Sequence, residues 1–191
     1  GDVHIRFSPG ETEGLTFEKS VVGGTVPKNF NPAVEKGLLE SMQKGVLAGY
    51  PVVYLKADLY DGSYHPVDSS EMAFKIAASL AYKEGLMKAN PVLLEPVANV
   101  KVYAPSDMIG DIMSAFTKRR GRVLGMTPTE RKGEQMLEAE APIAEMSDFA
   151  IQLRAITQGR GTYTMKFERY EDVPQMVADK IIAEAKANAE E

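Results

Sequence analysis

Between Val97 and Tyr170 the succession of a strand, a helix and a strand occurs twice, and this repeat restricts the fold more than any other feature. Apolar residues at helical spacing predict one helix over Ser106–Arg120 and a second over Ser147–Gln158. Alternating residues predict strands over 97–103, 122–126, 135–143 and 162–170. The doubled pattern is typical of the split βαβ arrangement called ferredoxin-like, in which four antiparallel strands carry two helices on one face.

The residues before this repeat predict a smaller set of elements. Strands are expected over 2–8, 15–22 and 51–60, and a helix is expected to begin with Asn31 as its N-cap and to stop at Gly45.

A longer helix is expected to follow the polar loop after the third strand. Asp68 is predicted to be its N-cap, with Glu71 completing a capping box. Met72, Ile76 and Leu80 recur every four residues and are expected to face a sheet.

The two halves are predicted to be separate α+β domains, residues 1–95 and residues 96–191, because a helix closes and a new strand begins near Leu94–Pro96. A last helix over Gln175–Ala187 carries apolar residues that must pack against another part of the chain. They are Met176, Val177, Ile181 and Ile182.

Composition excludes several classes of protein. The absence of cysteine excludes disulfides and thiolate metal sites and is compatible with a reducing cytoplasm, and two histidines are too few for most histidine metal clusters. No stretch reaches the roughly 18 apolar residues that a membrane span needs, so we expect a soluble protein. A net charge of -5 argues against coating of nucleic acid by bulk electrostatics, so any RNA contact must be local. The chain contains no phosphate-binding loop with the usual Gly, Lys and Ser or Thr spacing.

One basic run is a candidate for such a local contact. It consists of Lys118, Arg119, Arg120 and Arg122, and Arg131 and Lys132 follow a few residues later. The alternative interpretation is a solvated turn.

The loop after the third strand is the second candidate. Its residues are Gly62, Ser63, Tyr64, His65, Pro66, Val67 and Asp68. Ser, His and Asp together are reminiscent of a nucleophilic triad, but these residues share one exposed loop and do not converge from separate positions. Tyr64 and His65 are better suited to stacking on bases or bonding to RNA phosphates and 2′-hydroxyls. An ordinary exposed loop is the alternative.

Several separated stretches carry a resemblance to a known family. They are VGGTVPKNFNPAVEKGL (22–38), LAGYPVVYLKADLYDGSYHPVDSSEMAFKIAAS (47–79), PVLLEPV (91–97), GDIMSAFTKRRGRVLGM (110–126) and AEMSDFAIQLRAITQGRGTYTMKFERYEDVP (144–174). They resemble the last two domains of bacterial elongation factor G, nearly from end to end.

The resemblance implies a fold and a role. Residues 1–95 would form a ribosomal-protein-like βαβ domain with a left-handed crossover, an exception to the usual right-handed rule. Residues 96–191 would form a ferredoxin-like domain followed by a C-terminal helix that packs back on the first domain. In that family the loop from Gly62 to Asp68 enters the decoding A site, beside transfer RNA and messenger RNA, and the run from Lys118 to Arg122 faces ribosomal RNA.

The resemblance also implies that this part is a cytoplasmic monomer without catalytic residue, metal or cofactor, whose partners are ribosomal RNA and ribosomal proteins. GTP and magnesium would be bound by N-terminal domains before Gly1. The chain departs from the family in two ways at the end that would enter the decoding site. Pro66 stands where the family commonly has an acidic residue, and the second loop that forms this end in the family would lie before Gly1.

Three alternatives remain at this point. The parent could be a related GTPase for ribosome recycling or tetracycline protection. The chain could instead be a regulatory module that dimerises through its ferredoxin-like half, or, as a remote third, a hydrolase that uses His65.

Overall fold

The structure is a computed structural model that describes residues 1–190, and it divides into two compact units. One unit consists of Gly1–Val92 together with the segment from Gln175 onward, and the other of Leu93–Pro174. Each unit has its own sheet and its own buried core. The two-domain α+β architecture predicted from the sequence is therefore confirmed.

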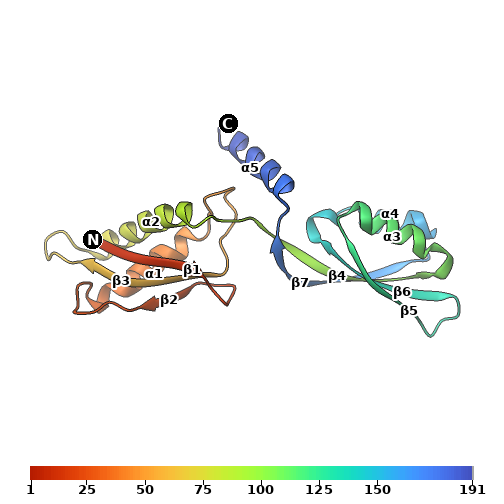
Figure 1. Cartoon of the computed structure of the whole chain (residues 1–191), viewed down its shortest axis with the longest axis horizontal. Helices are drawn as coiled ribbons and strands as arrows, with labels where there is room; N and C mark the ends of the chain where they lie inside the picture. The colour runs from red at the N-terminus through yellow and green to blue at the C-terminus, as the bar shows by residue number, and fades with distance from the viewer. Residues whose placement is uncertain (191) are drawn as a thin grey trace. The chain divides into compact units, whose positions relative to one another are not determined.

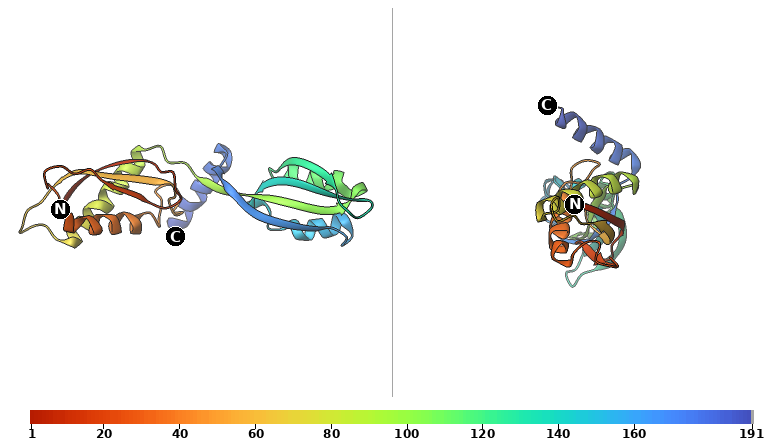
Figure 2. Two further views of the ribbon diagram at one scale, coloured as in Figure 1. Left: turned by 90° about the horizontal axis from the view of Figure 1, so that it is seen from below. Right: turned by 90° about the vertical axis from the view of Figure 1, so that its left-hand side faces the viewer.

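The first unit contains a sheet of three strands, covered on one face by two helices (Figures 1 and 2). The central strand β3 pairs antiparallel with β1 and parallel with β2. The connection from β2 to β3 runs through the first helix, which makes this segment a βαβ unit. The elements are β1 (Asp2–Pro9), β2 (Thr16–Lys19), η1 (Lys28–Phe30), α1 (Asn31–Ser41), β3 (Leu55–Ser63) and α2 (Glu71–Lys88).

The prediction that Asn31 caps α1 is wrong. Asn31 already has helical backbone angles, φ -56° and ψ -42°, because the 3-10 turn η1 leads directly into the helix. A capping residue needs an extended backbone to reach the first amides. Phe30 precedes the helix without a side-chain cap, and the Asn31 Oδ1 atom is buried with no hydrogen-bond partner among the described residues.

The prediction that Asp68 caps α2 is also wrong. Ser70 is the N-cap, since its extended backbone lets its hydroxyl oxygen accept a hydrogen bond from the Ala73 amide at 3.0 Å. Asp68 lies in the preceding turn, where its own amide donates to the carbonyl of His65.

The long helix buries the opposite side from the one predicted. Met72, Ile76 and Leu80 are 62%, 53% and 62% exposed. The buried series lies two residues further along, about 200° around the helix, and consists of Phe74, Ala78, Tyr82 and Leu86. The aromatic residues of this series determine which side of α2 is buried, because Phe74 packs against Phe30 with ring centroids 4.7 Å apart and Tyr82 packs against Phe7.

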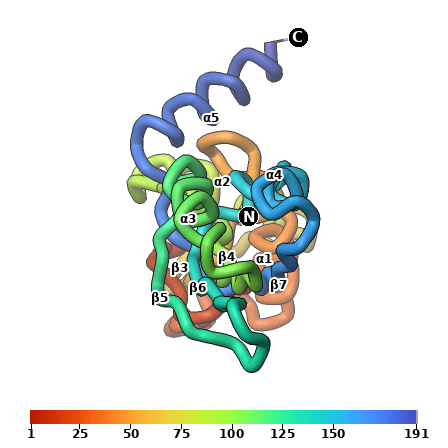
Figure 3. The backbone as a smooth tube through the Cα atoms, turned by 90° about the vertical axis from the view of Figure 1, so that its right-hand side faces the viewer, coloured from red at the N-terminus to blue at the C-terminus, as the bar shows by residue number. Residues whose placement is uncertain are grey.

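The second unit has the predicted ferredoxin-like order. Its antiparallel sheet has the order β5-β6-β4-β7, and α3 and α4 lie side by side on one face (Figure 3). The elements are β4 (Leu94–Pro105), η2 (Ser106–Met108), α3 (Ile109–Lys118), β5 (Arg122–Pro128), β6 (Glu134–Pro142), η3 (Ile143–Glu145), α4 (Phe149–Thr157) and β7 (Thr162–Asp172). The core includes Val100, Val102, Ile112, Phe116, Leu137, Phe149 and Leu153.

The last helix, α5 (Gln175–Ala189), belongs to the first unit and buries less than the sequence pattern predicts. Ala178 is its one buried residue among those described, while Ile181 and Ile182 are half-buried. Met176 is 87% exposed, so the expectation of an apolar partner for it is wrong.

No helix within residues 1–190 combines the length and apolar character that crossing a membrane requires.

Candidate functional site

The loop between β3 and α2 is closed by its own hydrogen bonds. The carbonyl of His65 accepts from the amides of Asp68 at 3.2 Å and Ser69 at 2.9 Å, and the His65 amide donates to the hydroxyl of Ser69 at 3.0 Å. With its backbone fixed in this way, the loop leaves His65, Pro66, Val67 and Asp68 exposed. We call residues 62–68 the tip loop; its first two residues, Gly62 and Ser63, are the end of β3.

Tyr64 connects the tip loop to the core of the first unit. Its ring lies 5.6 Å from that of Phe30, which in turn packs on the buried ring of Phe74. One part of the Tyr64 side chain is therefore held in place, while 40% of the residue stays exposed. An aromatic ring fixed on one side and open on the other is suited to stacking on a base.

The base of the tip loop lies against the first strand. A Cβ atom at Gly62 would lie 2.3 Å from the carbonyl oxygen of Asp2 and 2.5 Å from the Val26 side chain, so only glycine fits there. Ser63 donates a hydrogen bond to the Asp2 carboxylate at 3.1 Å. Close packing at these positions ties the loop to the sheet.

One carboxylate at this end of the sheet is held ionised. The backbone amide of Gly62, the hydroxyl of Thr25 and then the charge of His4 lower the pKa of Asp61 below its ordinary value. Thr25 donates to Asp61 at 3.2 Å and so joins the segment before α1 to the base of the loop.

The tip loop does not assemble a nucleophilic triad. Among the described residues, no side-chain hydrogen bond joins Ser63, His65 and Asp68, because Ser63 is directed to Asp2. Within residues 1–190 there is also no cluster of His, Cys, Asp or Glu suited to holding a metal ion.

The basic run of the second unit divides into buried and exposed residues. Arg119 is buried, donates to Asp148 at 2.9 Å and to the carbonyl of Ala115, and lies over the ring of Phe149. The expectation that Arg119 faces RNA is wrong, because its guanidinium links α3 to the start of α4. Lys118 is exposed.

Arg120 is also used inside the second unit. Its guanidinium makes two hydrogen bonds to the carboxylate of Glu95, at 2.7 and 2.9 Å, and a third to Glu145. Glu95 is only 9% exposed, so this pair joins the first strand of the unit to the end of α3. The hydrogen bonds that Arg120 donates to Glu95 raise the pKa of Arg120 above its ordinary value.

Arg122 is the most exposed arginine of the run, with 67% of its side chain accessible, although it donates to Glu140 at 2.7 Å. Glu140 also accepts two hydrogen bonds from Arg169, at 3.0 and 2.8 Å. Lys118 and Arg122 are therefore the residues of the run that remain open to a partner.

Comparison with known proteins places these two units in one family. The family model for elongation factor G, domain IV, matches residues 1–90, and the model for the elongation factor G C-terminus matches residues 92–181. The chain belongs to the elongation factor G family.

A solved structure is similar to this chain over almost its whole length. A protein from Thermus thermophilus is 43% identical and superposes with a TM-score of 0.90 over 98% of this chain. The chain spans 28% of the length of that relative.

In this elongation factor G chain, the sequence pattern predicts the position of the tip loop but not the residues that support it. Phe30, Thr25 and Asp2 are distant from the loop in sequence, and no local pattern marks them as its partners. Gly62 carried the one available signal, since a glycine inside a strand indicates a close approach of another backbone.

Proposed function

We propose that this chain is the part of a ribosomal translocase that enters the decoding A site and supports the movement of transfer RNA and messenger RNA. The observation that carries the proposal is the match of nearly the whole chain to domain IV and the C-terminus of elongation factor G. GTP binding and hydrolysis, with magnesium, belong to other domains of the longer protein.

The tip loop has the properties that such a role needs. Its backbone is closed on itself and its aromatic side chain is anchored on Phe30, so it keeps its shape when it meets RNA. Tyr64 and His65 offer ring faces, and the exposed His65 also offers hydrogen bonds. Occupation of the site by a stiff loop would block return of the transfer RNA, a function that requires no catalytic residue.

The exposed cations of the second unit provide a second contact in this proposal. Lys118 and Arg122 are exposed and would meet ribosomal RNA, whereas Arg119 and Arg120 hold the unit together. The contact is local, in agreement with the net charge of -5.

Single-turnover translocation tests the proposal. A full-length elongation factor that contains this sequence and carries both Tyr64→Ala and His65→Ala should translocate more slowly by about tenfold, because stacking on a base contributes about 1–3 kcal/mol. The matched control is Tyr50→Ala, which removes an aromatic side chain that is 60% exposed and precedes the opposite end of β3.

Unchanged rates in the double variant would remove the assignment of the tip. A factor that is inactive in translocation but splits ribosomes or releases tetracycline would replace translocation with one of the related roles.

A further inference from the structure

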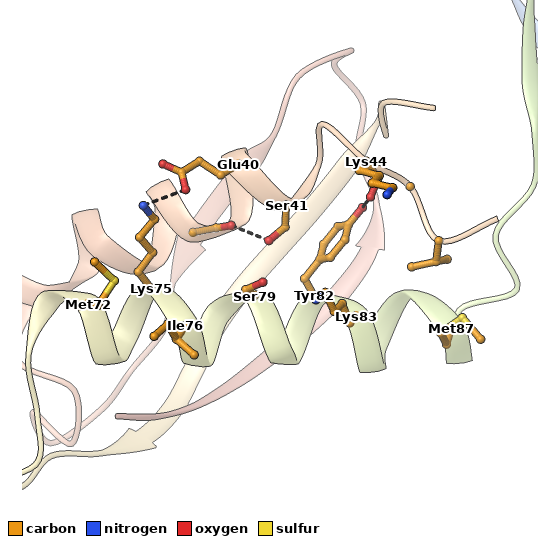
Figure 4. A pocket seen from close by; sticks show the side chains of 13 residues that line it. Glu40, Ser41, Lys44, Met72, Lys75, Ile76, Ser79, Tyr82, Lys83 and Met87 are labelled. Atoms are coloured by element: carbon orange, nitrogen blue, oxygen red, sulfur yellow. Dashed lines mark hydrogen bonds and ion pairs between the residues drawn. The ribbon is translucent and has the colours of Figure 1, made fainter. Parts of the chain in front are cut away.

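A groove runs between α1 and α2, next to the side of α2 that enters the core, and the buried Tyr82 belongs to its lining. Its volume is about 740 Å³, and Figure 4 shows its lining. Small residues let the two helices approach closely beside it: at Gly37 an added Cβ would lie 2.6 Å from the Lys75 carbonyl oxygen, and Ser41 and Ser79 also line the groove. The groove runs along α2 from Met72, in the first turn of the helix, to Met87 near its end.

One wall of the groove is apolar and unused by the fold. Met72, Ile76 and Met87 line it and are 62%, 53% and 66% exposed. The core of the unit uses the other apolar series of α2, and these three side chains do not belong to it. Exposed apolar side chains that line a groove on a folded unit mark an interaction surface.

The rim of the groove is basic. Lys44, Lys75 and Lys83 line it, and Glu40 is the one acidic residue among the lining residues. Glu40 is bonded to Lys75 at 2.8 Å, whereas Lys44 and Lys83 have no ion-pair partner among residues 1–190. A locally positive groove on a chain of net charge -5 favours an acidic ligand.

We propose that this groove binds an acidic amphipathic helix of a partner protein. Apolar residues of that helix would cover Met72, Ile76 and Met87, and its carboxylates would pair with Lys44 and Lys83. The stripe from Met72 to Met87 extends about 22 Å at 1.5 Å per residue, which matches a helix of about four turns. Bare RNA would satisfy the lysines but leave the apolar wall in water.

The test is fluorescence anisotropy with the whole chain and a labelled helical peptide of about 16 residues, which carries leucines on one face and glutamates beside them. We expect saturable binding that Ile76→Ser and Lys83→Glu each weaken by at least about fivefold, since central interface residues dominate affinity. The matched control, Lys36→Glu, changes an exposed lysine of α1 outside the groove and should leave affinity unchanged. Circular dichroism checks that each variant is folded.

Five results would overturn the proposal. The first is absence of saturable binding, and the second is an equal loss of affinity with Lys36→Glu. The third is a single-stranded RNA probe that competes with the peptide and whose binding is insensitive to Ile76→Ser. The fourth is binding by the isolated chain that disappears in a full-length elongation factor, which would assign the groove to another part of the same polypeptide. Dimerisation abolished by Ile76→Ser would likewise replace the partner helix by a second copy.

Discussion

The ring of Tyr64 packs against the ring of Phe30 at 5.6 Å, and Phe30 packs against the buried ring of Phe74 at 4.7 Å. This series of rings connects the exposed tip loop to the core of its unit. The orientation of the loop therefore depends on a residue that precedes it by more than thirty positions.

Phe30→Leu should loosen the tip loop without unfolding the chain. Loss of the ring contacts should cost about 1–2 kcal/mol, since aromatic pairs add about 0.5–1.5 kcal/mol to burial. Amide hydrogen exchange of residues 64–69 should become faster than in the unsubstituted chain. Phe167→Leu, at a position that is 48% exposed in the other unit, serves as the control. Unchanged exchange in the tip loop would show that Phe30 does not hold it.

Gly62→Ala should destabilise the first unit by about 1–3 kcal/mol, the usual cost of forcing an extra methyl group into a packed site. The new Cβ would meet the Asp2 carbonyl oxygen at 2.3 Å and disturb the pairing of β1 with β3. Urea unfolding measures the loss. At Gly14 an added Cβ meets nothing within 4 Å, so Gly14→Ala should stay within about 0.5 kcal/mol. Equal effects at the two glycines would contradict this account.

Ser70→Ala should cost about 1 kcal/mol, because the first turn of α2 loses the acceptor of the Ala73 amide. Asp68→Ala should change the free energy of unfolding by less than about 0.5 kcal/mol. Thermal unfolding followed by circular dichroism compares the two. A larger loss at Asp68 than at Ser70 would restore Asp68 as the cap.

Arg120→Met should destabilise the chain strongly, by about 3–5 kcal/mol, because it leaves the buried carboxylate of Glu95 without its cation. Lys118→Met, in the same basic run but exposed, should be nearly neutral in stability. Calorimetry distinguishes them. Similar unfolding temperatures for both variants would show that the Arg120 pair contributes little.

Stability should depend on the ionisation of Glu140 in acid. Hydrogen bonds from Arg169, and secondly from Arg122, lower its pKa from 4.5 to about 2. Because the folded chain binds this proton more weakly than the unfolded chain, the stabilisation is complete above about pH 4.5 and is lost as the pH falls toward 2.

Glu140→Gln should therefore lower stability at pH 7 and flatten the decline below pH 4.5. Urea midpoints measured through this range check the effect, with Glu11→Gln, at an exposed position, as the control. A variant that keeps the slope of the unsubstituted chain would show that other carboxylates cause the decline.

Much of the architecture follows from local pattern. The helices and strands of residues 97–170 were predicted close to their observed bounds, and their order confirmed the ferredoxin-like fold. The position of the tip loop between β3 and α2 was also predicted, since the strand and the helix on either side have clear periods. Contacts of that loop with RNA stay a prediction.

Burial was decided only by the tertiary structure. Two apolar series of equal spacing run along α2, and the choice between Met72 and Phe74 depended on Phe30 and Phe7, which arrive from distant segments. Likewise, Arg119 and Lys118 are neighbours in the basic run, yet only Arg119 meets Asp148 and Phe149. Periodicity and turn residues act within a few positions and so determined the elements, whereas the faces that became buried depended on which surfaces met across the fold.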